Sequence, residues 1–230
     1  MNSSQVYRML TWLSPSFPIG SFSYSHGLEN AIENGFIKDR ESLQNWLTGI
    51  LKYGTGRCEA SLFCLAFSAI AAPICDWPLE RVLLYTSAFH ATAELRLEST
   101  AQGKAFLDIL VKIHPSDVLC KMHQLFIELK CKPALAVAVA LACASEQFPL
   151  ELSLTGYLQS FTNQLVSAGT RLIPLGQTDS QHLMMAMMPV IQNVVKKAIE
   201  QPIEDTGSAI AMLELASMQH EKQYTRLFRS

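Results

Sequence analysis

The spacing of apolar residues between prolines constrains this chain more than any other feature of its sequence. Val6, Met9, Leu10 and Leu13 recur at the i, i+3, i+4 and i+7 positions of an α-helix, and similar stripes follow along the chain. Several of the 10 prolines stand where a new stripe begins, a position that helices accept. Alternating β-branched runs and Asn-Gly turns are almost absent. The pattern predicts an all-α, single-domain bundle of about eight to ten helices over residues 1–230.

Several segments carry local sequence signals that predict a particular helix, loop or helix cap. The run from Ala134 to Ala144 is apolar on all sides, which predicts a central, closely packed helix. A helix is expected from Pro149 through Leu165, and residues 169–176 are predicted to form a loop. Asp39 is a candidate N-cap for the helix that follows it, and Ser208 is the expected N-cap of a final helix. No low-complexity linker divides the chain, so we expect one domain.

The composition narrows the classes of protein to which the chain can belong. Apolar residues make up 49% of the sequence and charged residues only 17%, against about 25% charged in an average soluble domain. Either the core is large, or a partner covers part of the surface. The net charge of −2 gives no basic footprint, so no nucleic-acid partner is expected.

The apolar runs and the cysteines indicate a compartment. Residues 1–5 contain no basic segment leading into an apolar run, so no signal peptide is expected. The longest apolar runs fall short of the roughly 20 residues that span a membrane, so no membrane contact is expected. The six cysteines show no C-x-x-C spacing and are interpreted as reduced buried thiols. These features together predict a cytoplasmic protein.

Motifs for catalysis and for cofactor binding are missing from the sequence. Neither G-x-x-x-x-G-K-[ST] nor G-x-G-x-x-G occurs. Cys120 and His123 lie one helical turn apart, but two ligands do not complete a tetrahedral metal site. The methionine run at 184–188 is more typical of pliable core or an adaptable interface than of a copper site. We therefore expect no catalytic residue, no cofactor and no bound metal.

The segment from Trp12 to Glu29 carries the most information. Pro15, Pro18 and Gly20 fix an irregular path between two predicted helices. The segment is rich in aromatic and hydroxyl side chains and poor in Lys, Glu and Asp, which suits a buried but adaptable contact. From the residues alone, two interpretations stay open: packing back onto the bundle, or a binding surface.

At this segment the sequence resembles a known family. Residues 13–29, L-S-P-S-F-P-I-G-S-F-S-Y-S-H-G-L-E, are similar to the N-terminal signature of the urease accessory protein UreF family. Glu94-Leu95-Arg96, with Ser99 and Gly103, resembles the middle segment of that family. Residues 220–230, H-E-K-Q-Y-T-R-L-F-R-S, resemble its C-terminal H-E-x-Q-Y-[ST]-R-L-F-x-S tail. The resemblance covers the chain from end to end.

The resemblance implies a function as well as a fold. Members of this family are non-enzymatic maturation factors that form all-α bundles and homodimers. They bind a second accessory protein of the UreD or UreH type and, with it, recruit the GTPase UreG. The assembly docks on apo-urease and helps to place two nickel ions there. The missing phosphate loop fits this implied role, in which another protein hydrolyses GTP.

The resemblance also implies which residues make contacts. The N-terminal segment 1–22 and the C-terminal tail 224–230 are expected to bind partners. Phe22 stands where the family often has tyrosine. The tail is expected to become ordered against the UreD-type partner. The implied partner-binding residues are Phe22, Tyr24, His26, Glu29, Tyr224, Arg226, Leu227 and Phe228.

Other interpretations remain open at this point. One is an all-α hydrolase or transferase that uses Ser23, His26 and Glu29. Another is a direct nickel carrier, although the chain lacks a His-rich tract, and a related one is a tunnel through which nickel only passes. An arginine acting on the GTPase is a further alternative, for which the candidates by elimination are Arg57, Arg96 and Arg171.

Overall fold

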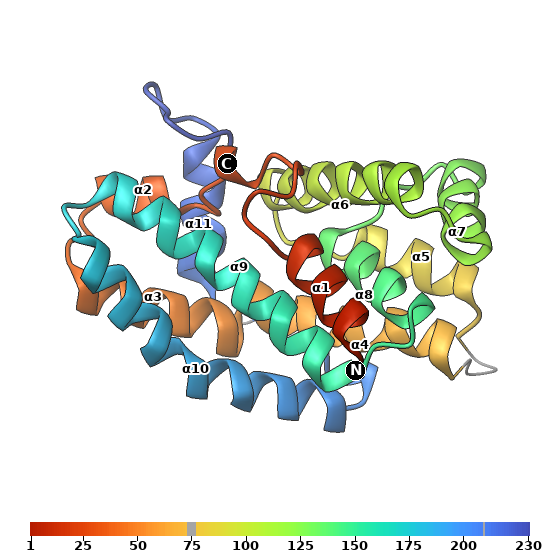
Figure 1. The fold of residues 1–230 in the computed structure, drawn as a ribbon. Helices are drawn as coiled ribbons and strands as arrows, with labels where there is room; N and C mark the ends of the chain where they lie inside the picture. Colours follow the sequence, from red (N-terminus) through yellow and green to blue (C-terminus); the bar gives the residue numbers. More distant parts are fainter. Residues whose placement is uncertain (73–76, 209) are drawn as a thin grey trace.

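The computed structural model describes residues 1–72, 77–208 and 210–230, and their fold is shown in Figure 1. These residues form α-helices and two 3-10 turns, with no β-strand among them, so the predicted all-α class is confirmed. In chain order the elements are α1 (Ser3–Trp12), η1 (Ser21–Ser23), α2 (Leu28–Glu33), α3 (Arg40–Tyr53), α4 (Thr55–Ala71), α5 (Leu79–Ala88), α6 (Ala93–Ile113), α7 (Asp117–Glu128), α8 (Leu135–Ser145), α9 (Leu150–Leu172), α10 (Gln177–Glu200), η2 (Ile203–Asp205) and α11 (Ala211–His220).

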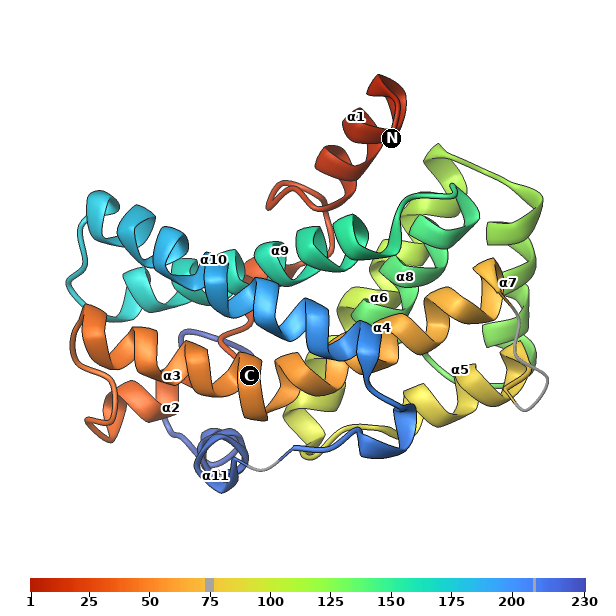
Figure 2. The ribbon, with the colours of Figure 1, turned by 90° about the horizontal axis from the view of Figure 1, so that it is seen from below.

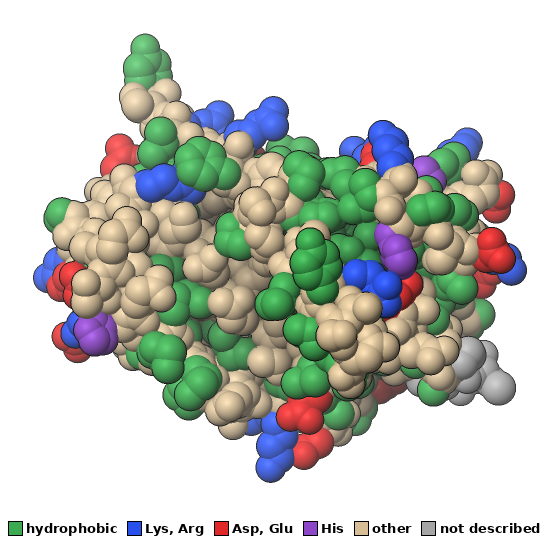
Figure 3. Space-filling model, in the orientation of Figure 1, with side chains coloured by type: hydrophobic (Ala, Val, Ile, Leu, Met, Phe, Trp, Pro, Cys, Tyr) green, Lys and Arg blue, Asp and Glu red, His purple; other side chains and the backbone are tan. Residues whose placement is uncertain are grey.

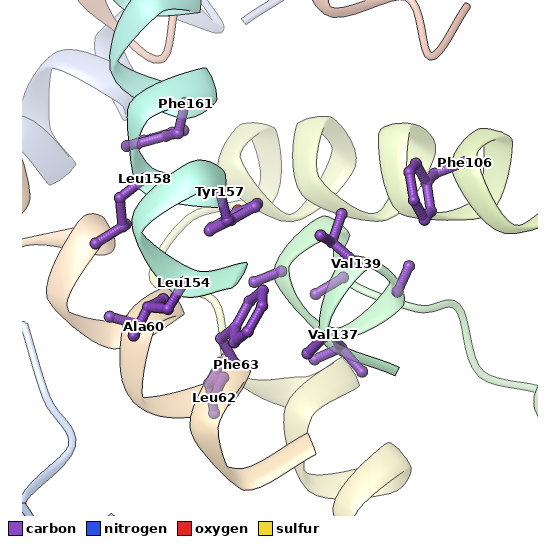
Figure 4. Packing of buried hydrophobic residues seen from close by; sticks show 14 of the residues in the cluster. Ala60, Leu62, Phe63, Phe106, Val137, Val139, Leu154, Tyr157, Leu158 and Phe161 are labelled. Carbon is purple, nitrogen blue, oxygen red and sulfur yellow. The ribbon is translucent and has the colours of Figure 1, made fainter. Parts of the chain in front are cut away.

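Helix α8 lies at the centre of the bundle, as its composition predicted. It packs against α4, α6, α7 and α9, and every residue from Ala136 to Ala144 is buried. The small alanine side chains let the neighbouring helices approach closely. Figure 4 shows Phe63 of α4 and Tyr157 of α9 beside this helix, with ring centroids 5.6 Å apart. The alanine-rich helix therefore forms the middle of the core.

Helix α9 is longer than the sequence predicted. It continues through Leu172, so the expected loop at 169–176 is wrong for its first four residues. A Cβ at Gly169 would lie 2.6 Å from Leu43 Cδ2 of α3. The glycine is there because two helices approach closely, and not because the chain turns. Helix α10 then packs back along α9 and α3 (Figure 1).

The start of the final helix also differs from its prediction. Helix α11 begins at Ala211 with Ile210 as its N-cap, so Ser208 is not the cap. The prediction for Cys75 lies outside the described residues. The other five cysteines are free thiols, but only Cys58 and Cys143 are buried as predicted; Cys64 and Cys131 are partly buried, and Cys120 is exposed. Across residues 1–72, 77–208 and 210–230, no helix is both long and apolar enough to cross a membrane.

Helix α1 stands apart from the bundle (Figure 2). Tyr7 and Leu10 on this helix are 75% and 66% exposed. Trp12 at its end is buried and stacks on Phe148, with ring centroids 5.5 Å apart. The helix is thus anchored by Trp12 at its C-terminal end and by Gln5 and Arg8, which contact the carbonyl and the carboxylate of Glu146 at 3.0 and 2.9 Å.

Candidate partner-binding surface

The signature segment crosses the surface of the bundle between α1 and α2. Ser160 Oγ on α9 donates a 2.9 Å hydrogen bond to the carbonyl of Leu13 and holds the start of the segment. The chain then passes through η1 and turns at His26, whose φ of 58° lies in the left-handed region. Non-glycine residues rarely adopt this conformation, so surrounding contacts must hold it. The turn directs the following residues into α2.

The C-terminal tail lies against this segment, although some 200 residues separate them in sequence. The Arg229 amide donates to the Ser23 carbonyl at 2.8 Å, and the Ser25 amide donates to the Ser230 carbonyl at 2.7 Å. The Ser25 hydroxyl donates to the same Ser230 oxygen at 2.5 Å. These bonds close the tail onto η1 and the turn before α2, and Figure 1 shows the C-terminus beside the N-terminal segment.

Glu29 is the hub of this contact. Its carboxylate accepts hydrogen bonds from the Leu227 amide at 2.6 Å and from the Phe228 amide at 3.0 Å. His220 Nε2 lies 3.1 Å from the same carboxylate. Glu29 is 8% exposed, and a carboxylate is accommodated at that depth because several donors surround it. One buried side chain of α2 therefore binds both α11 and the tail.

A second carboxylate, Glu94 of α6, extends the network. His220 Nδ1 lies 2.8 Å from Glu94 Oε2, and Arg226 Nη1 donates to Glu94 Oε1 at 3.1 Å. Burial raises the pKa of the Glu94 carboxyl, while His220 and Arg226 oppose that shift. The fully buried His220 thus bridges Glu29 and Glu94, and Arg226 reaches Glu94 from the tail.

The last residue of the tail enters a separate polar cluster inside the bundle. The Ser230 hydroxyl donates to Glu98 at 2.7 Å, and His26 Nδ1 lies 3.3 Å from the same carboxylate oxygen. His26 Nε2 lies 2.6 Å from the Thr55 hydroxyl. Burial acts to lower the pKa of His26, but Glu98 and Glu59 outweigh it and the pKa is raised. The Glu98 carboxylate therefore holds both the left-handed turn at His26 and the last residue of the tail.

Arg171, near the end of α9, clamps the two segments from outside. Its guanidinium carbon lies 3.9 Å from the ring centroid of Phe22 and 4.3 Å from that of Phe228. Its Nη1 donates to the Phe22 carbonyl at 3.0 Å. Cation–π contacts of this kind join the two aromatic residues through one cation. Arg171 therefore connects η1, the tail and α9.

The predicted partner-binding residues come together, but in two layers. Tyr24, His26, Glu29 and Phe228 are buried, at 8% exposure or less. The outward residues are Phe22 (70% exposed), Leu227 (64%), Tyr224 (fully exposed) and the half-buried side chain of Arg226. In Figures 1 and 3 the tail projects from the molecule, with a hydrophobic side chain at its tip and hydrophobic and basic side chains near its base. Only the second set is free to touch another protein.

The tail differs from the expectation in one respect. It was expected to become ordered against a partner, yet in the single chain it already lies on the chain's own η1, α2 and α6. The reason is that Glu29, Glu94 and Glu98 supply acceptors for its donors. Sequence reasoning did not identify Glu98 or Arg171 as contacts of the tail. The one available signal was the pair Glu94 and Glu98, two acidic residues four apart in the first half of α6 and therefore on one face of that helix.

The geometry bears on the enzyme alternative. His26 contacts Glu98 and Thr55, and Glu29 contacts His220 and the tail. Within the described residues neither side chain is bonded to the Ser23 hydroxyl, so these three do not form a nucleophile–base pair. The described part of the chain also contains no group of three or more His, Cys, Asp or Glu side chains placed to hold a metal ion.

Comparisons with known proteins identify the family of the chain. The model of the UreF family matches residues 37–188, which form the body of the bundle. A urease accessory protein UreF from Rhodopseudomonas palustris (strain BisB5) is 45% identical over 231 residues, covering 99% of this chain and 92% of the relative. Proteins of the same name from Bradyrhizobium sp. (strain BTAi1) and Granulibacter bethesdensis are 41% and 40% identical, each covering 98% of this chain and 92% and 94% of the relative. These alignments cover 98–99% of this chain, and the chain belongs to the UreF family of urease accessory proteins.

Proposed function

We propose that the chain acts in urease maturation by protein binding, and that the surface formed by η1 and the tail binds an accessory protein of the UreD or UreH type. One observation carries the proposal: two segments at opposite ends of the sequence form a single surface with buried polar supports. Phe22, Tyr224 and Leu227 are exposed on it, although apolar side chains of this size are usually buried.

The composition of the surface also supports binding. Aromatic residues and arginine dominate the energetics of protein interfaces, and they do so best on a rigid support. Here Arg171 lies against the rings of Phe22 and Phe228, Arg226 is held by Glu94, and the backbone of the tail is tied to Glu29. A surface ordered before binding loses less conformational entropy on association.

The rest of the proposal follows the family. The bound pair recruits a UreG-type GTPase and docks on apo-urease, where the dinickel centre is assembled, and the chain works as a homodimer in the cytoplasm without catalytic activity of its own. The lack of a phosphate loop in the sequence supports a GTPase on another chain. Urease activation in the presence and absence of this chain tests this role.

The partner-binding surface is tested by co-purification with the UreD-type protein. The double variant Tyr224→Ala/Leu227→Ala removes two exposed side chains and should weaken binding about 30-fold or more, because truncating even one hot-spot side chain costs about 2 kcal/mol. Ile127→Ala on α7 is the matched control, since Ile127 is 58% exposed and lies outside the surface. Circular dichroism checks that each variant keeps its helices.

Two further variants test the same surface less cleanly. Arg226→Ala removes the contact with Glu94, and deletion of residues 224–230 also removes the buried Phe228. Both should abolish co-purification, but each also disturbs the fold beneath the surface. Undiminished co-purification of the correctly folded Tyr224→Ala/Leu227→Ala protein would reject the proposal.

A further inference from the structure

A cleft on another face of the molecule collects positive charge. It lies where the end of α3, the start of α4 and the end of α10 meet, and has a volume of about 350 Å³. Figure 2 shows α10 running along α3 and α4 on this side. Its polar lining includes Lys52, Arg57, Lys197, Ser61 and Asn193, with Tyr53 at its rim. We refer to it as the basic cleft.

The basic cleft stands out against the charge of the whole chain. Three of its lining side chains are cationic and one, Glu200, is acidic, which gives the lining a charge of +2 in a protein of net charge −2. Within the described residues, none of Lys52, Arg57 and Lys197 forms an ion pair with a carboxylate. The three cations therefore line the cleft without an ion-pair partner among the described residues, and Glu200 offsets only one of their charges.

Helix dipoles explain two of these cations but not the third. Lys52 and Lys197 lie in the last turns of α3 and α10, where a cation is stabilised by the negative end of the helix. Arg57 lies in the first turn of α4, the positive end, and that turn contains no acidic residue. A cation there is unfavourable for the helix. Arg57 is held in place because its Nη2 donates to the Asp205 carbonyl at 3.0 Å.

We infer that the basic cleft binds a phosphate-bearing anion. Arginine and lysine are the side chains that recognise phosphate oxygens, and the positive end of α4 adds to their field. Ser61 and Asn193 supply neutral hydrogen-bonding groups in the lining, and Tyr53 is 56% exposed beside them. The volume exceeds that of one inorganic phosphate, so the ligand is pyrophosphate or the phosphates of a nucleotide.

Calorimetric titration of the full chain with pyrophosphate, at low ionic strength, tests the inference. We expect saturable binding at one site per chain that weakens as salt increases. Arg57→Gln and Lys197→Gln should each weaken binding about tenfold or more, as expected for losing a hydrogen bond to a charged group. Lys121→Gln, an exposed lysine on α7 outside the cleft, is the matched control and should leave the affinity unchanged.

A second variant separates loss of binding from loss of folding, and a second ligand distinguishes a free anion from a nucleotide. Arg57→Gln also loses the contact with Asp205, so Lys197→Gln, at an exposed position, tests the cleft without that effect. A parallel titration with GDP identifies a nucleotide site if GDP binds more tightly than pyrophosphate, and a site for the free anion if the two bind alike. The inference is overturned if neither probe gives saturable heat, or if Lys197→Gln and Lys121→Gln behave alike.

Discussion

At the scale of single residues, Glu29 determines whether the tail stays in place. Its carboxylate accepts two backbone amides of the tail and contacts His220. Glu29→Gln keeps the size of the side chain but puts an NH2 group among donors, which leaves buried donors without an acceptor. Breaking a buried charged contact costs about 3 kcal/mol or more, so amide hydrogen exchange at Leu227 and Phe228 should quicken about 100-fold.

The control for this prediction is Glu33→Gln, an exposed position on the same helix. It removes the same charge without touching the tail and should leave the exchange rates as they are. Equal protection of the two tail amides in Glu29→Gln and in the unaltered chain would show that Glu29 does not hold the tail.

A second residue-scale prediction concerns pH. Burial raises the pKa of Glu59, although the Tyr157 hydroxyl donates to it at 2.7 Å and His26 lies nearby. The native state therefore keeps a proton that the unfolded state loses above pH 4.5, so the free energy of unfolding falls as pH rises through that range. Glu59→Gln removes this titration because an amide does not ionise. The amide oxygen still accepts the hydrogen bond from the Tyr157 hydroxyl.

Urea unfolding at several pH values between 5 and 8 measures this effect. Relative to the unaltered chain, Glu59→Gln should gain stability as pH rises. The variant also loses the part of the raised His26 pKa that Glu59 causes, and this change acts in the same direction. Glu151→Gln, at an exposed position of α9, should show no such gain. A stability difference for Glu59→Gln that is independent of pH would contradict the raised pKa.

At the scale of elements, the packing of α6 on the loop before α8 depends on one small residue. A Cβ at Gly103 would lie 2.3 Å from the carbonyl oxygen of Pro133, a backbone atom that cannot move aside cheaply. Gly103→Ala should therefore lower the free energy of unfolding by about 3 kcal/mol. Gly49→Ala in α3 is the control: its Cβ meets only an Ile210 methyl at 3.5 Å, and the change should stabilise the helix by about 0.5–1 kcal/mol. Thermal and urea unfolding compare the two, and equal effects would contradict the close approach at Gly103.

The elements also show what the sequence can and cannot predict. Local patterns identified the Asp39 N-cap and the central alanine-rich helix, because both depend on near neighbours or on composition. The end of α9 was missed because the reason for Gly169, its contact with Leu43, lies more than 100 residues away. The polar clusters around Glu29 and Glu98 were missed for the same reason: sequence spacing does not show which carboxylate meets which histidine.

At the scale of the whole molecule, the low charge has two physical explanations, and the structure contains both. Helices α4, α8 and α9 enclose a large apolar core. The surface also carries large apolar side chains, including Met212, Leu215 and Met218 along one side of α11 and Tyr224 and Leu227 in the tail. A chain of net charge −2 has little electrostatic repulsion to keep such surfaces apart.

The isolated chain is therefore expected to self-associate. In sedimentation velocity, its average mass should rise with protein concentration above that of one chain. The double variant Met212→Lys/Met218→Lys places two charges on the exposed side of α11 and should shift the distribution toward one chain per particle. Lys substitutions at Gln181 and Gln192, which are exposed and uncharged, make the same change in net charge away from α11 and should have a smaller effect. A mass that stays at one chain over the whole concentration range, or equal behaviour of the two variants, would show that the apolar side of α11 does not drive association.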